Sequence, residues 1–316
     1  MNQLGAARQV FMFAIDYGRT NRSFVLTPSE ASAAGIFYKI NTHTNCQRQP
    51  LPISKSSNFS TYPVSFHEYQ TAYEKVMSHL CYGNSYLVNL TAKTPIKTSL
   101  SISEIFYNSS ALYCLLHTNQ FVCFSPESFV KIENGHIHSF PMKGTIDADI
   151  PNAASIILND KKETAEHYTI VDLIRNDLSM VSKNVHVPRF RFIDRISTNQ
   201  KNLLQVSSEI CGEVDDNWNC HIGDIMNSLL PAGSVTGAPK EKTLEIIAEA
   251  ENYERGFYTG VFGYFDGISL DSGVMIRFIE NENGQLYYKS GGGITIYSDA
   301  RSEYEEMINK VYVPIA

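Results

Sequence analysis

The chain has 316 residues, of which 43% are hydrophobic, and it carries a formal net charge of −7. This length and apolar fraction are sufficient for a large buried core, either in one α+β domain or in two domains. Lysine and arginine form no block, which argues against a nucleic-acid-binding surface. The six cysteines form no Cys-x-x-Cys pair and no zinc-finger spacing, so free thiols in a reducing cytoplasm are expected.

The first elements in chain order are predicted to be strands. The apolar run at 10–15 is too short to cross a bilayer and ends at Asp16, so we predict a buried strand in a cytoplasmic protein with no membrane segment. Further strands are expected at 24–26 and 36–38. Residues 41–63 are polar, with prolines and a serine-rich patch, and they predict a surface loop.

A capped helix is predicted from residue 66. The Ser65 hydroxyl can accept from the first turn while Glu68 reaches back, and apolar residues recur at helical spacing as far as Leu80. Gly83 is typical of a helix end. Alternation of side chains at 86–91 then predicts a strand.

The middle of the chain mixes hairpins with one long helix. Asn134-Gly135 is typical of a hairpin turn between two strands. Residues 161–182 predict a helix with one side formed by Tyr168, Val171, Ile174 and Leu178. Strands are expected at 185–195 and 203–214, and helices at about 220–229 and 239–252.

The last third returns to strands. They are expected at 258–265, at 274–280 and at 286–289, with turns at Asp266-Gly267 and Asn283-Gly284. The glycines at 291–293 are expected to break the chain before a strand at 294–297. A final helix is expected near Ser302, with Glu305 at capping-box spacing. Hairpins dominate and βα alternation is absent, which favours an α+β fold with antiparallel sheets.

Two helices carry acidic residues on one face. Glu163 and Glu166 are three apart, and Glu303, Glu306 and Lys310 follow the same face of the last helix. Such spacing is usually a solvated charged face. Two acidic pairs are also a means of holding Mg²⁺, which takes one or two carboxylates, several waters and an anionic substrate.

Isolated residues leave alternatives open. Lys143, between Met142 and Gly144, is a candidate reactive amine close to a metal. Gly233–Lys240 is a tight turn entering a helix, suited either to an anion or to packing alone. Arg277, in a largely apolar stretch, needs a partner that is either a protein acid or a bound carboxylate. Glu127 is either a general acid or an ordinary loop residue.

A series of motifs in order along the chain resembles the chorismate-utilising enzymes, the family of anthranilate, aminodeoxychorismate, isochorismate and salicylate synthases. The matching stretches begin at about residue 64 and continue to the C-terminus. They are 83–91, 125–127, 141–145, 162–167, 171–177, 233–240, 255–260, 276–277, 291–294 and Glu303-x-x-Glu306-x-x-x-Lys310.

The resemblance implies a fold and a domain organisation. Large antiparallel sheets would form a central sandwich with helices outside, in four layers (α/β/β/α). Residues 1–316 would form a single chorismate-binding catalytic domain, with 1–63 as a shortened N-terminal region and 64–316 as the catalytic core. This N-terminal region lacks the Leu-Leu-Glu-Ser element of feedback-inhibited relatives, so inhibition by tryptophan is not expected.

The resemblance also implies the site. Mg²⁺ would bind Glu166 and Glu306 directly, and Glu163 and Glu303 through waters. The enolpyruvyl carboxylate of chorismate would contact Arg277, Tyr258 and the backbone of Gly291 and Gly293, with Gly260 beside them. Gly144, Thr145 and Lys310 would lie near the ring, and Glu127 would protonate the departing C4 hydroxyl.

The residues at three positions distinguish the activities within the family. Aminodeoxychorismate synthases carry lysine at the position of Lys143, where anthranilate synthases usually carry alanine, and a desolvated lysine is a nucleophile. Leu87 stands where isochorismate and salicylate synthases have a water-activating lysine. Gln205 stands where anthranilate synthases have a histidine associated with pyruvate loss. The resemblance therefore favours amination of chorismate at C4, for p-aminobenzoate and folate synthesis.

The nitrogen source is expected to be ammonia, either from solution or from a separate glutamine amidotransferase subunit, because no Gly-x-Cys-x-Gly nucleophile elbow is present in the sequence. Two alternatives remain open. One is the large subunit of an anthranilate synthase, which Lys143 and Gln205 fit poorly. The other is a non-catalytic relative that binds chorismate, against which the intact set Glu127, Lys143, Glu166 and Glu306 argues.

Overall fold

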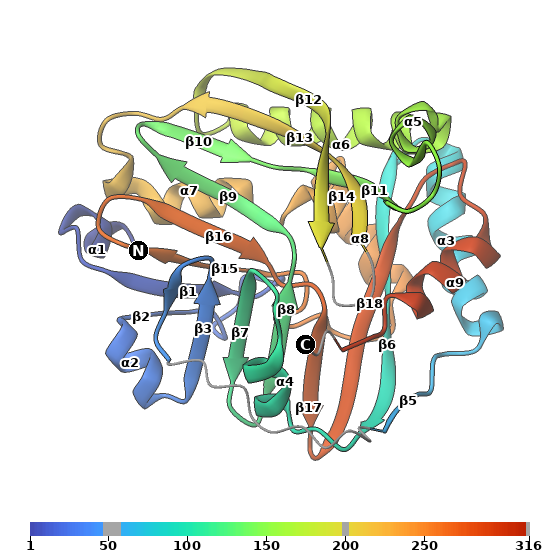
Figure 1. The fold of residues 1–316 in the computed structure, drawn as a ribbon, viewed down its shortest axis with the longest axis horizontal. Coiled ribbons are helices and arrows are strands. Elements are labelled where there is room, and N and C mark those ends of the chain that lie inside the picture. Colours follow the sequence, from blue (N-terminus) through green and yellow to red (C-terminus); the bar gives the residue numbers. More distant parts are fainter. Residues whose placement is uncertain (47–57, 198–201, 314–316) are drawn as a thin grey trace. The chain divides into compact units, whose positions relative to one another are not determined.

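The computed structural model describes residues 1–46, 58–197 and 202–313 (Figure 1). The described chain divides into two compact units. The first unit contains Met1–Gln9, Ser128–Ser234 and Phe265–Asp271, and the second contains Val10–Glu127, Val235–Tyr264 and Ser272–Ala316. The region expected at 1–63 is divided between the units after Gln9, and the single catalytic domain stays a prediction. Part of the loop predicted at 41–63, residues 47–57, lies outside the described residues.

The first unit is built from long antiparallel strands and helices. Its strands follow the order β11-β13-β10-β9, and β12 also pairs with β13. Their bounds are β9 (Ser128–Glu133), β10 (His136–Ser139), β11 (Met142–Asp147), β12 (Lys183–Ser197) and β13 (Asn202–Glu213). Its helices are α1 (Asn2–Ala6), α5 (Ala153–Asn159), α6 (Lys161–Ser179) and α7 (Ile222–Leu229), and Trp218–His221 forms a 3-10 turn.

The hairpin and the long helix predicted in this unit are confirmed. Asn134 and Gly135 have φ of 51° and 76° between β9 and β10, as the turn requires. On the side predicted for helix α6, Val171 and Leu178 are buried, whereas Tyr168 is 58% exposed and the preceding residue, His167, is fully buried. The buried face runs through His167, Val171 and Leu178.

The second unit holds a complete antiparallel sheet of nine strands, in the order β14-β6-β18-β17-β8-β7-β3-β4, with β5 on β6. The bounds are β3 (Ile36–Ile40), β4 (His43–Thr44), β5 (Phe59–Thr61), β6 (Leu87–Thr98), β7 (Tyr113–His117), β8 (Phe121–Ser125), β14 (Gly237–Ala238), β17 (Phe278–Glu282) and β18 (Gln285–Ile294). Strands of the other sheet are β1 (Phe11–Ile15), β2 (Phe24–Leu26), β15 (Val261–Phe265) and β16 (Leu270–Val274). Helices are α2 (Pro28–Ala33), α3 (Phe66–Tyr82), α4 (Ile102–Asn108), α8 (Lys240–Ala250) and α9 (Ala300–Asn309).

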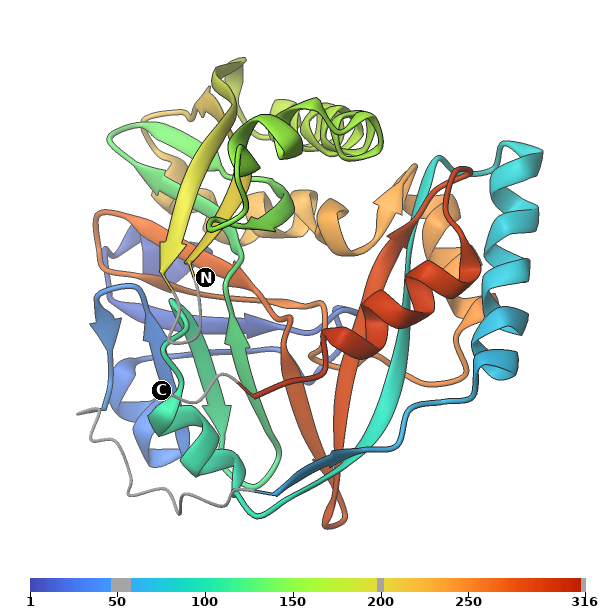
Figure 2. The ribbon, with the colours of Figure 1, turned by 45° about the vertical axis from the view of Figure 1, so that its right-hand side comes forward.

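Apolar side chains cover both faces of the complete sheet within the second unit. On one face, α3, α8 and α9 pack over β6 and β18 through a cluster that includes Val76, Leu90, Ile246 and Met307 (Figure 2). On the other face, β1 and β15 pack against β3, β7 and β8 through a second cluster. The predicted α+β class, with large antiparallel sheets and helices, is confirmed.

The start and end of α3 follow the prediction. Ser65 and Glu68 form a capping box, in which the Ser65 hydroxyl accepts from the Glu68 N–H and the Glu68 carboxylate accepts from the Ser65 N–H. Gly83 ends the helix with φ of 86°.

Three predictions in the last third are wrong. The strand expected at 274–280 is interrupted between β16 and β17, since Arg277 takes a left-handed φ of 55°. The glycines at 291–293 do not break the chain, because β18 continues through them in register with β6. The last helix begins at Ala300, since the side chain of Asp299 accepts from the Ser302 N–H at 2.9 Å and caps the helix three residues earlier than expected.

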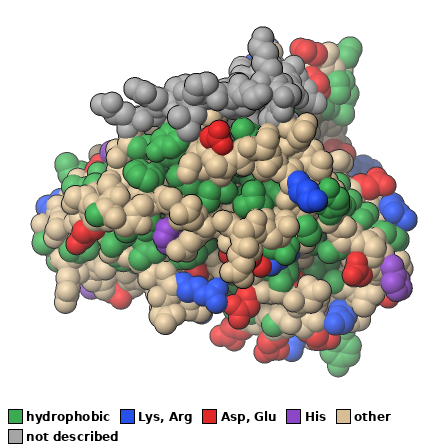
Figure 3. All heavy atoms as spheres, turned by 90° about the horizontal axis from the view of Figure 1, so that it is seen from below, with side chains coloured by type: hydrophobic (Ala, Val, Ile, Leu, Met, Phe, Trp, Pro, Cys, Tyr) green, Lys and Arg blue, Asp and Glu red, His purple; other side chains and the backbone are tan. Residues whose placement is uncertain are grey.

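On the face drawn in Figure 3, the lysine and arginine side chains of the described residues are dispersed among acidic and apolar ones. No helix in the described ranges combines the length and the apolar character that a membrane span needs.

Candidate functional site

Lys143 lies on β11 of the first unit, where its ammonium group meets a carboxylate of α6. Lys143 Nζ and Glu166 Oε2 are 2.6 Å apart, and the Glu166 side chain is only 10% exposed. Helix α6 is capped by Asp160, whose side chain accepts from the Glu163 N–H at 2.8 Å. The fold therefore brings the candidate lysine to the acidic helix face, a contact that sequence spacing could not establish.

The backbone after Lys143 runs close to the second carboxylate of this helix. Gly144 has φ of 82°, and a Cβ at this position would lie 3.1 Å from Glu163 Oε2 and 3.4 Å from Ile157 Cδ1. Both the left-handed conformation and the limited space therefore favour glycine. Thr145 pairs with Gln205 of β13. The residue expected near the substrate ring and the position that distinguishes anthranilate synthases are therefore neighbours in one sheet.

His167 follows Glu166 and lies inside the unit. Its Nε2 is 2.7 Å from Ser208 Oγ on β13, and the side chain is fully buried. Burial lowers the pKa of His167 to about 4, and the charges of Arg191 and Lys143 act in the same direction. The imidazole is therefore neutral near pH 7.

In the second unit, α9 places its polar face over the glycines of β18 (Figure 2). A Cβ on Gly292 would lie 3.5 Å from Glu303 Oε2, 3.7 Å from Lys310 Nζ and 3.9 Å from Glu306 Oε1. Lys310 Nζ lies 2.7 Å from Glu306 Oε1 and donates to the Gly291 carbonyl at 2.9 Å. The three charged residues predicted on one face of the last helix thus lie together above the glycine stretch of β18.

The two outer glycines of this run face the opposite side of β18. A Cβ on Gly291 would lie 2.4 Å from the Leu90 carbonyl oxygen, and one on Gly293 would lie 3.0 Å from Leu87 Cδ1. Their observed role is the close approach of β6 and β18. Leu87, where some relatives carry a lysine, is 6% exposed and makes an apolar contact.

Arg277 lies in the break between β16 and β17. Its guanidinium carbon is 5.4 Å from the centre of the Tyr312 ring, and Nε is buried without a hydrogen-bond partner among the described residues. No carboxylate forms an ion pair with Arg277 within the described ranges. The sequence left open a protein acid or a bound carboxylate as the partner of Arg277. Among the described residues no protein acid takes this role, and the bound carboxylate stays a prediction.

The remaining predicted site residues of this unit are placed as follows. Tyr258 is 3% exposed, and burial raises the pKa of its phenol. The N–H of Gly260 donates to Phe257, its carbonyl accepts from Met275 at 2.7 Å, and a Cβ would lie 2.2 Å from a β1 carbonyl oxygen, so the observed role of Gly260 is packing. Glu127 follows β8, and its N–H donates to Ser125 Oγ at 3.1 Å.

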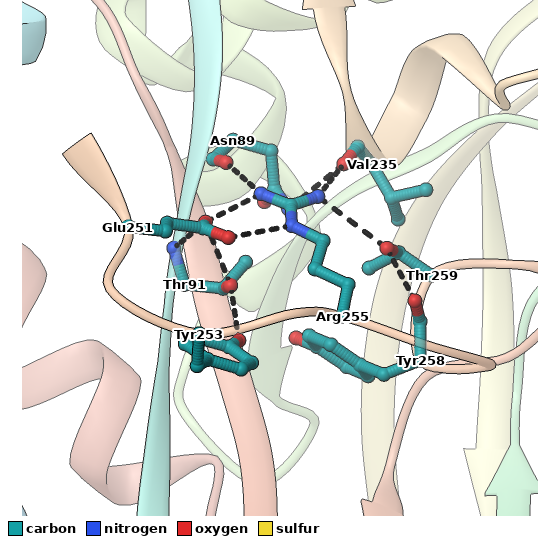
Figure 4. Close-up of polar contacts among 8 residues, drawn as sticks. All are labelled: Asn89, Thr91, Val235, Glu251, Tyr253, Arg255, Tyr258 and Thr259. Carbon is teal, nitrogen blue, oxygen red and sulfur yellow. Dashed lines mark hydrogen bonds and ion pairs between the residues drawn. The ribbon is translucent and has the colours of Figure 1, made fainter. Parts of the chain in front are cut away.

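One buried polar cluster of the second unit was missed. Arg255 donates to both carboxylate oxygens of Glu251, at 2.6 Å and 2.9 Å, and both side chains are 2% exposed (Figure 4). The remaining contacts of the cluster involve Asn89, Thr91, Val235, Tyr253, Tyr258 and Thr259. A Glu followed four residues later by an Arg was the available sequence signal, but it resembles an ordinary surface pair.

The guanidinium of Arg255 ties the turn that carries Tyr258 to β6 and to the end of α8. It donates to the Asn89 carbonyl at 2.6 Å and to the Val235 carbonyl at 2.9 Å. The ring of Tyr17 lies 4.6 Å from the guanidinium carbon. The cluster therefore fixes the backbone from which Tyr258 projects.

The two acidic pairs belong to different units, Glu163 and Glu166 to the first and Glu303 and Glu306 to the second. Among the described residues, no three His, Cys, Asp or Glu side chains form a ready metal site. Each pair offers the carboxylate oxygens that Mg²⁺ prefers, and the space above Gly292 is a cradle that a Cβ would fill. The residue types suit the metal that the resemblance implies, and the ligand set stays a prediction.

Comparison with known proteins adds independent support. The chain is 50% identical over 315 residues, covering 99% of this chain and 95% of the relative, to a protein of Haemophilus influenzae described as an uncharacterized PabA-like protein. It is 32% identical over 265 residues to aminodeoxychorismate synthase component 1 of Bacillus subtilis, covering 79% of this chain and 55% of that protein. The crystal structure of anthranilate synthase component I from Streptococcus pneumoniae matches with a TM-score of 0.68 and 27% identity, over 80% of this chain and 58% of that one.

The family model that matches describes a chorismate binding enzyme and covers residues 21–316. The matched region includes all of the predicted site residues and most of both units. The chain is thus a member of the chorismate-binding enzyme family, related to the large components of aminodeoxychorismate and anthranilate synthases.

Proposed function

We propose that this protein replaces the C4 hydroxyl of chorismate with an amino group, giving 4-amino-4-deoxychorismate for p-aminobenzoate and folate synthesis. The observation that carries the proposal is the position of Lys143, 2.6 Å from Glu166 on a strand whose next residue, Gly144, has a left-handed φ of 82°. An amine held beside a carboxylate proposed to bind the metal is suited to attack a substrate that binds there.

The substrate is a dianion, and the proposed site supplies cations for it. Mg²⁺ on Glu166 and Glu306, with Glu163 and Glu303 holding its waters, would neutralise the ring carboxylate and polarise it. Arg277, which has no acid partner among the described residues, would receive the enolpyruvyl carboxylate together with the Tyr258 hydroxyl. Lys310 would lie near the ring end.

The proposed chemistry is a double displacement. The neutral amine of Lys143 attacks C2 of chorismate, both ring double bonds shift toward C4, and the C4–O bond breaks while Glu127 gives the leaving hydroxide a proton. Ammonia then attacks C4, both double bonds shift back, and the C2–N bond to Lys143 breaks, with the proton that ammonia loses balancing the one that the departing amine gains. An ion-paired ammonium is no nucleophile, so Lys143 has to lose a proton before it attacks.

Ammonia is proposed to come from a separate glutamine amidotransferase subunit. The sequence of this chain contains no nucleophile elbow for glutamine hydrolysis. The related Bacillus subtilis protein is described as a component 1, a name that implies a second component.

The test is an assay of the purified chain with chorismate, Mg²⁺ and ammonium. We expect no p-aminobenzoate from the chain alone and its appearance when a 4-amino-4-deoxychorismate lyase is added, because the proposed product keeps its enolpyruvyl group. Omitting ammonium or adding EDTA should abolish the product. Fluorescent anthranilate formed without the lyase would identify the alternative, an anthranilate synthase, which the match to the Streptococcus pneumoniae structure keeps as a second candidate.

Replacing Gly144 with alanine is expected to reduce the turnover number about tenfold or more. An added Cβ would be 3.1 Å from the Glu163 carboxylate in a left-handed conformation that is unfavourable for alanine, so we expect the Glu163 side chain or β11 to shift and disturb the position of Lys143. The matched control is Gly135→Ala, since Gly135 has a φ of 76° but no neighbour within 4 Å of a new Cβ. Equal activity of the two variants in the lyase-coupled assay would show that crowding at Gly144 is unimportant.

A further inference from the structure

The hydroxyl of Ser208 lies at a junction of three elements in the first unit. Ser208 is fully buried on β13, and its Oγ accepts from the Arg191 N–H of β12 at 2.9 Å. The same oxygen is 2.7 Å from Nε2 of His167 on α6. The Ser208 N–H donates to the Pro141 carbonyl at 3.0 Å, where the chain enters β11. One residue thus joins α6, β12 and the start of β11.

The two ends of this junction are next to the lysine and the carboxylate of the candidate site. Pro141 precedes Lys143 by two residues, and His167 directly follows Glu166. A chain of contacts leads from Lys143 along the backbone to Pro141, and from there through Ser208 to His167. The ion pair between Glu166 and Lys143, at 2.6 Å, closes it into a loop. Each link is a buried hydrogen bond or a short piece of regular backbone, so the path is stiff.

The buried surroundings make the junction hard to replace by other contacts. His167 Nδ1 has no hydrogen-bond partner among the described residues, and the ring packs against Phe190 with 5.8 Å between centroids. The bond to Ser208 is therefore the one polar contact of this ring within the described ranges. Losing it would leave a buried nitrogen unsatisfied and allow the first turns of α6 to move on the sheet.

We propose that His167 and Ser208 are positioning residues, which act through backbone and helix to set the separation of the Lys143 amine and the Glu166 carboxylate. The inference rests on the proposed function, because this separation matters for turnover only if both groups serve the reaction. Neither residue is proposed to touch chorismate. Their loss should lower the turnover number, while the KM for chorismate, governed by groups elsewhere, stays nearly the same.

The experiment compares Ser208→Ala, His167→Leu and His167→Gln in the ammonium assay, with crystal structures of the wild type and of Ser208→Ala. We expect Ser208→Ala and His167→Leu to lose between about tenfold and a hundredfold in kcat with KM changed by no more than about twofold. His167→Gln, whose amide nitrogen can reach Ser208, should recover most of the loss. The distance from Lys143 Nζ to Glu166 Oε2 should increase in Ser208→Ala.

The matched control is Ser207→Ala, which removes a buried hydroxyl from the same strand where Oγ has no partner among the described residues. It should keep wild-type kcat. Wild-type kcat in Ser208→Ala, an equal loss in Ser207→Ala, or an unchanged Lys143–Glu166 distance would overturn the inference. If the wild type forms no aminated chorismate, the proposed function fails, and the distance in the two crystal structures alone decides the positioning role.

Discussion

Replacing Lys143 with alanine is expected to reduce formation of 4-amino-4-deoxychorismate by about 10³-fold or more, because the enzyme-bound intermediate then has no nucleophile to form it. Binding of chorismate should be less affected, since Arg277, Tyr258 and the acidic residues remain. Any residual amination is expected at C2, where ammonia attacks directly when no lysine occupies that carbon. Chromatography of lyase-coupled and uncoupled reactions measures both products.

A matched lysine outside the candidate site separates this effect from a general loss of charge. Lys183 forms an ion pair with Asp215 at 2.7 Å in the same unit, but its side chain is 74% exposed. Lys183→Ala should retain wild-type turnover. Full C4 amination by Lys143→Ala would eliminate the covalent route. Intact-mass analysis without ammonium gives a second readout, in which the wild type should gain the mass of one chorismate less one water and the variant should not.

The largest expected effect on stability is that of Arg255→Met. The substitution leaves the Glu251 carboxylate buried without its guanidinium and removes the donor from the Asn89 and Val235 carbonyls. Breaking a buried ion pair by removing one partner typically costs about 3–5 kcal/mol. We therefore expect urea denaturation to show a loss of this size in the free energy of unfolding.

Arg22→Met is the corresponding surface control. Arg22 pairs with Glu254 at 2.9 Å, but the two side chains are 53% and 82% exposed, and such pairs contribute about 1 kcal/mol at most. If Arg255→Met were no more destabilising than Arg22→Met, the cluster would not hold the turn before Tyr258. Glu251→Gln should also be destabilising, because it leaves the buried Arg255 guanidinium without its carboxylate.

The elements that local chemistry determines could be predicted from the sequence. The capping box at Ser65, the left-handed glycine at 83 and the Asn134-Gly135 hairpin turn depend on residues within a few positions of each other. The helical spacing of apolar residues predicts the helix at 161–182. The exposure of Tyr168 could not be predicted in this way, because an aromatic ring fits the apolar pattern whether it is buried or packs on the surface against Phe190.

Features that depend on distant segments were not predictable in the same way. The glycines at 291–293 suggest a break, but pairing with β6 keeps them extended and uses the missing side chains for close approach. The left-handed Arg277 interrupts a stretch whose apolar pattern favours a continuous strand. Likewise the Lys143–Glu166 pair joins residues from β11 and α6, and no spacing rule connects these two elements.

The candidate site was predictable as a set of residue types and not as an arrangement. The sequence grouped Glu303, Glu306 and Lys310 on one helix face, and the structure shows that this face lies above Gly292. It gave no sign that Glu251 and Arg255 form a buried pair, because the same spacing occurs on exposed helices. Burial distinguishes a buried ion pair from a surface pair with the same spacing, and burial depends on the whole fold.

The position of the new C–N bond tests the proposed reaction most directly. Chorismate, Mg²⁺ and ¹⁵N-ammonium are incubated with the purified chain, and the aminated product is isolated without a lyase for NMR. We expect nitrogen-15 bonded to C4, with the enolpyruvyl group retained. Nitrogen-15 at C2, or its appearance in anthranilate with release of pyruvate, would contradict the role proposed for Lys143.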